Sequence, residues 1–242
     1  MTKIVAYTAL HYGKDYLASA IRSVIDHVDE YHALYTPIGS HGHRTDVPCP
    51  ETRDELLEIA LSAGSKLRWH EGEWGWEGQQ RDTIFSVAPD ADLILALDAD
   101  EIWAEGLAQM VIESAAKHPF PTNFRVPIIH YWRSFHRCVL HDPAYPVRAI
   151  SPKAKGQEAI TFHPFRADTP DTPHDMPSHE VTEILRKIRA GEYRDEAMAI
   201  NHMGYAQRSE IVNYKQLTHG HKGEWRRDVD WFNDKFMANA QV

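Results

Sequence analysis

Apolar side chains in the first half of the chain follow two alternating spacings, one typical of strands and one typical of helices. Residues 3–7 are apolar from Ile4 onward, which predicts a buried strand. After this run, apolar side chains recur at helical spacing and would share one face; they are Leu17, Ile21, Val24, Ile25 and Val28. The chain is therefore predicted to begin with a strand followed by an amphipathic helix.

The same alternation continues through the first half. Further strands are predicted at residues 31–35, 66–70 and 92–97, and further helices around residues 56–61, 81–88 and 107–114. The strand at 92–97 is apolar almost throughout, as in a parallel sheet that is covered on both faces. Repeated β-α units predict a mostly parallel sheet, whose ligands bind beyond the carboxyl ends of the strands.

From about residue 123 the pattern becomes irregular. Strands are predicted at residues 125–131, 147–150 and 159–162, and helices at 181–190, 209–217 and 230–238. Loops rich in proline and histidine separate the strands. We therefore expect one domain with two halves, an α/β half at residues 1–122 and an irregular half at residues 123–242.

Composition and charge narrow the class of protein. With 242 residues, 43% hydrophobic and 25% charged, the chain can bury the core of one large α/β domain. Its apolar runs are shorter than the roughly 20 residues of a membrane span, so we expect neither a membrane anchor nor a signal peptide. Two cysteines, Cys49 and Cys138, are too few for a disulfide framework, which favours the cytoplasm. The net charge of -9 disfavours nucleic-acid binding without excluding a nucleic-acid acceptor.

An acidic run follows the apolar strand at residues 92–97 directly. Asp98, Asp100 and Glu101 place three carboxylates within four residues, at the edge of the sheet where ligands bind. Such carboxylates repel one another, and a divalent cation offsets that repulsion. Magnesium and manganese suit oxygen ligands of this kind. The simpler alternative is a solvated acidic loop that caps the helix near Gly106.

The stretch from Gly78 through Arg81 to this acidic run resembles family 2-like GT-A glycosyltransferases. Those enzymes carry an arginine-bearing helix and then an apolar strand that ends in Asp-x-Asp. The resemblance extends to the N-terminal strand and helix and to a later segment, His202-Met203-Gly204-Tyr205, and leaves the middle of the chain unmatched. It implies a GT-A fold, which is Rossmann-like, with a mostly parallel sheet flanked by helices and an irregular acceptor-side C-terminal half.

The resemblance also implies a metal site. Asp100 would hold Mn²⁺ or Mg²⁺ on the diphosphate of a sugar nucleotide, with a UDP-sugar favoured as donor, and Asp98 would face the ribose or the metal shell. His202 would complete the site from a strand end after the apolar segment 197–200, and Gly204 would allow close backbone approach. With 16 histidines in the chain, a purely structural role for His202 stays open.

Other residues correspond to the donor-binding positions of these enzymes. Thr8 and Ala9, expected just past the first strand, and Thr36, past the second, resemble positions that contact the nucleotide. Arg81 corresponds to an arginine that bridges ribose or phosphate oxygens. Ordinary turn chemistry is the alternative for the first three residues, and a surface ion pair is the alternative for Arg81.

The C-terminal half supplies candidates for catalysis. Lys222 lies in the glycine-containing segment 219–223, which we expect to act as a lid over the diphosphate leaving group. An inverting transfer needs a carboxylate that accepts the proton of the acceptor hydroxyl. Glu180 and Asp175 are the candidates, with Glu180 preferred because of its distance from the acidic run. The chain lacks the acidic pair that the family usually carries there.

The predicted function is transfer of a sugar from a nucleotide-diphosphate sugar to an acceptor hydroxyl. The acceptor stays open between a glycan, a lipid-linked intermediate, a small molecule and a modified nucleic-acid base. A nucleotidyltransferase on the same fold is the alternative enzyme, and a non-catalytic carbohydrate-binding protein is the alternative outside enzymes. A nicotinamide oxidoreductase is disfavoured because no Gly-x-Gly-x-x-Gly follows the first strand.

Overall fold

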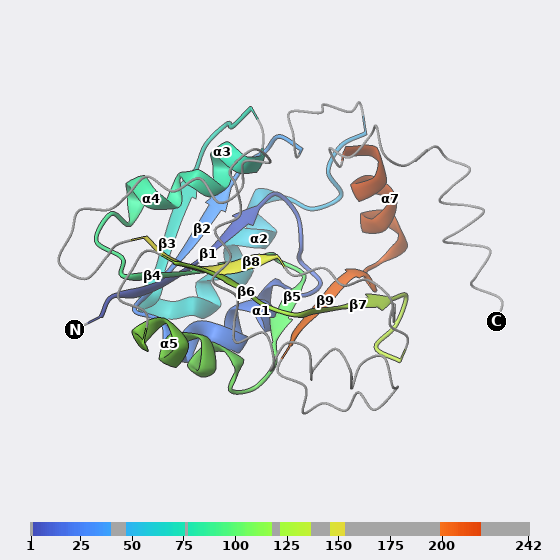
Figure 1. Ribbon diagram of the computed structural model, residues 1–242. Coiled ribbons are helices and arrows are strands. Elements are labelled where there is room, and N and C mark those ends of the chain that lie inside the picture. The colour runs from blue at the N-terminus through green and yellow to red at the C-terminus, as the bar shows by residue number, and fades with distance from the viewer. Residues whose placement is uncertain are drawn as a thin grey trace.

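The computed structural model (Figure 1) describes residues 2–39, 47–75, 77–117, 122–136, 146–152 and 199–218. The strand predicted at 159–162 and the helices predicted at 181–190 and 230–238 lie outside the described residues. In the described part of the chain, no helix has the length and apolar character needed to cross a membrane.

A six-stranded sheet forms the centre of the molecule, in the order β3-β2-β1-β4-β8-β6. Its strands are β1 (Ile4–Leu10), β2 (Glu30–Tyr35), β3 (Leu67–Glu71), β4 (Leu93–Leu97), β6 (Thr122–Arg125) and β8 (Val147–Ser151). The first four are parallel, whereas β8 is antiparallel to both β4 and β6. The predicted mostly parallel α/β sheet, which is the fold class that the GT-A resemblance implies, is thereby confirmed.

Helices cover both faces of this sheet (Figure 1). They are α1 (Leu17–Val24), α2 (Arg53–Ala60), α3 (Glu77–Asp82), α4 (Ile84–Val87) and α5 (Leu107–Lys117). A further helix, α7 (Ser209–Thr218), follows β9 and lies apart from this sheet (Figure 1). Side chains of α1, α2 and α5 pack into the larger core, and those of α4 pack into a second core on the opposite face. Short 3₁₀ helices extend α1 at Ile25–His27 and α2 at Leu61–Lys66.

The apolar composition of β4 follows from its central position. Successive side chains of a strand point to opposite faces, so Leu93, Leu95 and Leu97 join the larger core. Ile94 and Ala96 join the second core beside α4. Because both faces are covered, all five residues are buried, as the continuous apolar run predicts.

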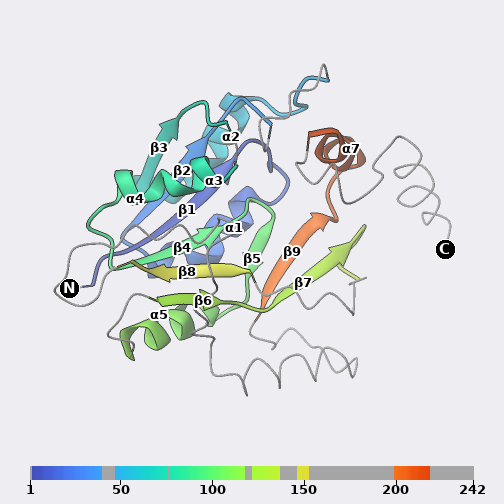
Figure 2. The same ribbon diagram turned by 45° about the horizontal axis from the view of Figure 1, so that its top comes forward.

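A smaller sheet lies beside the carboxyl edge of β4 (Figure 2). It contains β5 (Glu101–Trp103), β9 (Ile200–Tyr205) and β7 (Ile128–Trp132), in the order β5-β9-β7. β5 is antiparallel to β9, whereas β7 is parallel to β9. In this sheet, the residues that follow Asp100 in the chain pair with strands from the second half.

Three predicted strand boundaries are wrong. β1 continues to Leu10, so Thr8 and Ala9 lie inside the strand and not past it. The single strand predicted at 125–131 is two strands in different sheets, because Pro127 lies between β6 and β7 and lacks the N–H that a continuous ladder needs. His202 lies within β9, since this strand begins at Ile200, where the predicted apolar segment ends.

The described helices differ less from the prediction. α5 and α7 are found where they are predicted, and the helix predicted at 81–88 is two short helices, α3 and α4, on either side of Thr83. The division of the chain at residue 122 stays a prediction. β6 and β8 come from the second half of the chain, yet they belong to the same sheet as the strands of the first half.

Candidate active site

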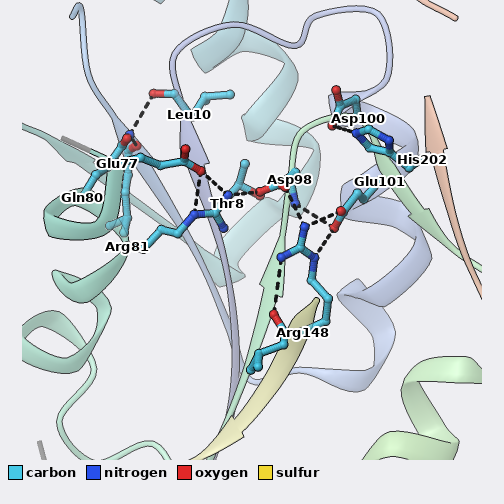
Figure 3. Close-up of polar contacts among 12 residues, drawn as sticks. Thr8, Leu10, Glu77, Gln80, Arg81, Asp98, Asp100, Glu101, Arg148 and His202 are labelled. Carbon is cyan, nitrogen blue, oxygen red and sulfur yellow. Dashed lines mark hydrogen bonds and ion pairs between the residues drawn. The ribbon is translucent and has the colours of Figure 1, made fainter. Parts of the chain in front are cut away.

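The acidic run forms a tight turn at the carboxyl end of β4. The backbone N–H of Glu101 donates to the carbonyl oxygen of Asp98 at 3.0 Å, and Glu101 then opens β5. Asp100 is 6% exposed and Glu101 is 0% exposed. The alternative of a solvated acidic loop is therefore wrong, because these carboxylates are enclosed by cationic and polar side chains (Figure 3).

Asp98 is held by two arginines. Arg81, on α3, donates to Oδ1, and Arg148 donates from Nη2 to Oδ2 at 2.8 Å. Burial alone would raise the pKa of Asp98, but Arg148 and Arg81 hold it well below its usual value. Arg81 also binds Glu77 at 2.8 Å, but Arg81 is buried, so this ion pair is part of the network around the acidic turn and not the surface pair of the alternative interpretation.

Arg148 also forms an ion pair with Glu101. Its Nε and Nη2 donate to the two carboxylate oxygens of Glu101 at 2.7 and 2.5 Å. Arg148 lies on β8, beside β4 in the sheet, and is 8% exposed. Burial raises the pKa of Glu101 to about 7, with Asp98 adding to the rise and Arg148 opposing it. The sequence analysis missed Arg148; the available signal is a charged residue inside an otherwise apolar strand, where burial demands a partner.

Asp100 has a separate set of partners. Its Oδ2 accepts hydrogen bonds from Gln207 Nε2 at 2.8 Å and from Lys215 Nζ at 3.1 Å. Its Oδ1 faces Nε2 of His202 at 3.5 Å. Burial alone would raise the pKa of Asp100, but the Lys215 ammonium holds it below its usual value. Gln207 and Lys215 come from the segment after β9, where no local pattern singled them out.

His202 is neutral near pH 7, because burial lowers its pKa to about 4. Its Nδ1 lies 2.7 Å from Nδ1 of His130, on the neighbouring strand β7. The ring also lies close above Gly204, where an added Cβ would stand 2.3 Å from Cε1 and 2.6 Å from Nε2 of His202. A larger residue at position 204 would therefore displace the imidazole, whereas a close approach of a bound ligand to Gly204 stays a prediction.

The loop after β1 also packs against the acidic turn. Gly13 has a φ of 137°, and a Cβ on it would stand 2.3 Å from Cβ of Ala99. Oε2 of the buried Glu51 accepts hydrogen bonds from the backbone N–H groups of Gly13 at 2.7 Å and Lys14 at 2.9 Å, and its Oε1 binds Arg208 at 2.7 Å. Glu51 thus joins this loop to the segment that carries Gln207.

The predicted nucleotide contacts lie on β1 and after β2. Thr8 is fully buried, and its hydroxyl accepts a hydrogen bond from the Tyr31 hydroxyl at 2.8 Å, while Ala9 is half-buried. Thr36 follows β2 directly, and its carbonyl oxygen lies 2.8 Å from Nδ1 of His11. Whether these residues bind a nucleotide stays a prediction.

Part of the predicted site cannot be placed. Asp175, Glu180 and Lys222 lie outside the described residues. Within the described ranges, no group of three or more histidine, cysteine, aspartate or glutamate side chains is arranged to hold a metal ion. The predicted metal ligands Asp100 and His202 do face each other, whereas both oxygens of Asp98 accept arginine hydrogen bonds.

Comparisons with known proteins give structural likeness alone. No family model matches the sequence, and no curated protein matches it. A 4-diphosphocytidyl-2C-methyl-D-erythritol synthase is 14% identical with a TM-score of 0.40, over 62% of this chain and 74% of that one. Residues 1-349 of TarS from S. aureus are 11% identical with a TM-score of 0.40, over 99% of this chain and 79% of that one.

A third similar structure is glucosyl-3-phosphoglycerate synthase from Mycobacterium tuberculosis, in complex with Mn²⁺, uridine diphosphate and phosphoglyceric acid. It is 13% identical with a TM-score of 0.35, over 56% of this chain and 45% of that one. The chain thus spans less than half the length of that synthase. Structural similarity with so low a sequence identity and TM-score does not bear on the activity of the chain. That activity has to be argued from its own residues.

Proposed function

We propose that the chain is a glycosyltransferase that moves a sugar from a nucleotide-diphosphate sugar to an acceptor hydroxyl, with a divalent cation at Asp100 and His202. The observation that carries this proposal is the pair formed by Asp100 Oδ1 and His202 Nε2, 3.5 Å apart at the carboxyl edge of a parallel sheet. Ligands bind at this edge in sheets of this kind.

The chemistry of this pair suits a cation. Ligand atoms about 2.1 Å from one ion and at roughly right angles lie about 3 Å apart, close to the separation found here. A metal-binding imidazole must be neutral, and burial keeps His202 neutral near pH 7. We propose Mn²⁺ or Mg²⁺, which would supply Lewis-acid neutralisation of the diphosphate charge. A contact from Asp98 would have to replace one of its arginine hydrogen bonds.

The lysine and arginine side chains around the acidic turn have different roles in this proposal. Lys215 lies beside Asp100 and can reach a diphosphate oxygen placed at this carboxylate, where its charge would favour the leaving group. Arg81 and Arg148 hold the turn from the opposite side, so the backbone around Asp100 is fixed before a ligand binds. Lys222 is proposed as a further diphosphate contact.

The remaining roles follow from the resemblance and have no structural support yet. Thr8, Ala9 and Thr36 are proposed to lie near the nucleotide, which we take to be uridine diphosphate. Glu180, with Asp175 as the alternative, is proposed as the base that accepts the acceptor's proton in an inverting transfer.

Ligand-dependent thermal stability tests the proposal directly. A sugar nucleotide that binds the folded state raises the apparent melting temperature, and we expect UDP-sugars to do so more strongly with Mn²⁺ than without it. Analysis of the products then separates the reactions. A glycosyltransferase releases the nucleoside diphosphate, whereas a nucleotidyltransferase releases inorganic diphosphate. If no sugar nucleotide stabilises the protein in the presence of Mn²⁺ or Mg²⁺, the proposed function is wrong.

A further inference from the structure

The small sheet brings three side chains from distant segments into one row. β5 and β9 pair so that Glu101 lies opposite His202, and β9 and β7 pair so that His202 lies opposite His130. The backbone N–H of Met203 donates to the carbonyl oxygen of Asp100 at 2.7 Å, which fixes the acidic turn against β9. Residues opposite one another on neighbouring strands share a face of the sheet, so both imidazoles lie on the same face.

The two imidazoles meet through one specific pair of atoms. Nδ1 of His130 lies 2.7 Å from Nδ1 of His202, and the ring planes are nearly perpendicular at 86°. A hydrogen bond between two ring nitrogens contains one proton, so one imidazole donates and the other accepts. When His202 donates, its Nε2 carries a lone pair, and this lone pair faces Oδ1 of Asp100.

Packing holds the His202 ring in this orientation. The Gly204 backbone lies so close beneath the ring that even a methyl group would overlap Cε1 and Nε2. Asp100 is fixed from its other side by Gln207 and Lys215, both of which bind Oδ2 and leave Oδ1 directed towards His202. Two acceptor atoms, a carboxylate oxygen and a bare imidazole nitrogen, then face each other, and a cation between them would satisfy both.

The geometry points to His130 as a positioning residue that accepts the Nδ1–H of His202 and thereby aims the Nε2 lone pair at a divalent cation held by Asp100. Metal-binding histidines commonly donate their other ring N–H to an outer-shell acceptor, which fixes both tautomer and ring orientation. The inference rests on the proposed function, because it assumes a cation at Asp100. It adds a residue that the resemblance does not supply.

Three substitutions of His130 distinguish this role from simple packing. His130→Asn keeps an acceptor at the same number of bonds from the backbone as Nδ1, whereas His130→Gln moves its amide one bond farther out and His130→Leu has no acceptor. We expect the Asn variant to bind Mn²⁺ within about 3-fold of the unchanged protein. The Gln and Leu variants should lose about 10- to 100-fold in Mn²⁺ affinity, which is the usual effect of removing an outer-shell partner.

The measurement is Mn²⁺ affinity in the presence of UDP, from the electron paramagnetic resonance signal of the free ion. His32→Leu is the matched control, because His32 on β2, like His130, pairs with another histidine on the neighbouring strand: its Nδ1 lies 3.1 Å from Nε2 of His70 on β3. It should leave Mn²⁺ affinity unchanged, so that loss of a buried histidine pair alone does not explain the effect.

The outcomes separate this inference from the function on which it rests. If Asp100→Asn and His202→Ala lose Mn²⁺ affinity while His130→Gln and His130→Leu keep it, His130 only packs and the inference is overturned. Equal losses in the Asn and Gln variants would also overturn it, because the acceptor position would then not matter; this comparison stands even if the Leu variant does not fold. If Asp100→Asn itself leaves Mn²⁺ affinity unchanged, the metal site and the proposed function are both wrong.

Discussion

Asp98 and Asp100 stand two positions apart in the sequence, but their carboxylates have different partners. Asp98 binds two arginines through both oxygens, whereas Asp100 binds Lys215 and Gln207 through one oxygen and directs the other towards His202. At the residue scale the two aspartates are therefore not equivalent. Asp98 stabilises the turn, and Asp100 is the carboxylate that we propose binds the cation.

Asp100→Asn should remove metal-dependent binding of a sugar nucleotide, because the amide keeps the shape of the side chain but loses its charge. We expect the loss in Mn²⁺ affinity to exceed the roughly 10- to 100-fold effect of an outer-shell change. Calorimetric titration of UDP with and without Mn²⁺ measures it, with Asp26→Asn on the exposed side of the 3₁₀ helix as control. Unchanged manganese dependence would show that the cation binds elsewhere.

Glu180→Gln should leave donor binding intact and reduce sugar transfer, because the amide cannot accept the acceptor's proton. Removal of a general base costs about 10²- to 10⁴-fold in rate. Turnover and donor affinity should be measured on the same variant, with Glu183→Gln as a control three positions along the chain. Near-normal transfer by Glu180→Gln would mean that Glu180 is not the base.

At the scale of elements, the site depends on β8 as much as on the strand that precedes the acidic turn. β8 is antiparallel to β4, and this pairing places Arg148 under both Asp98 and Glu101. The positive charge of Arg148 offsets the repulsion between the half-buried Asp98 carboxylate and the buried Glu101 carboxylate. A strand from the second half of the chain, paired between β4 and β6, thus stabilises a turn of the first half.

Arg148→Met should destabilise the protein, because it leaves the fully buried Glu101 without its cation. Breaking a buried ion pair by removing one partner costs about 3 to 5 kcal/mol. Urea denaturation measures the change in free energy of unfolding, and Arg22→Met, at an exposed position of α1, serves as the comparison. A change below about 1 kcal/mol, the range of an exposed pair, would contradict the structural role of Arg148.

The sequence predicts elements best where local pattern and tertiary burial agree. β1 and β4 are apolar runs because helices cover both faces, so their pattern is visible without the structure. β5 begins with the charged Glu101 and pairs with a segment about a hundred residues away, and local patterns carry no such information. Arg148, Lys215 and His130 were missed for the same reason, since each acquires its role from a distant partner.

On the scale of the whole molecule, buried and half-buried histidines make stability depend on pH. Burial lowers the pKa of His11, His32 and His70, and lowers that of His202 to about 4. In the unfolded chain these groups titrate near about 6.5. The unfolded state therefore binds more protons at acid pH, so the stability from these groups is complete above about pH 6.5 and is lost as the pH falls towards their folded-state pKa values.

His32→Asn should reduce this loss, because one buried group that must stay neutral is removed. Each such proton contributes at most about 1.4 kcal/mol per pH unit to the slope of stability against pH. Denaturation between pH 7 and pH 5 should give a shallower slope for His32→Asn, and the exposed His136→Asn should keep the original slope. Equal slopes for the unchanged protein, His32→Asn and His136→Asn would show that His32 does not contribute to the pH dependence of stability.

The pairing of β5 with β9 also has a consequence for the order in which the molecule folds. The parallel strands β1 to β4 and their helices come from one continuous stretch of chain, whereas Glu101 meets His202 only after a loop of about a hundred residues has closed. Contacts so distant in sequence form late. We therefore expect newly folding molecules to form the parallel part of the central sheet before they bring together Asp100 and His202, the proposed cation ligands.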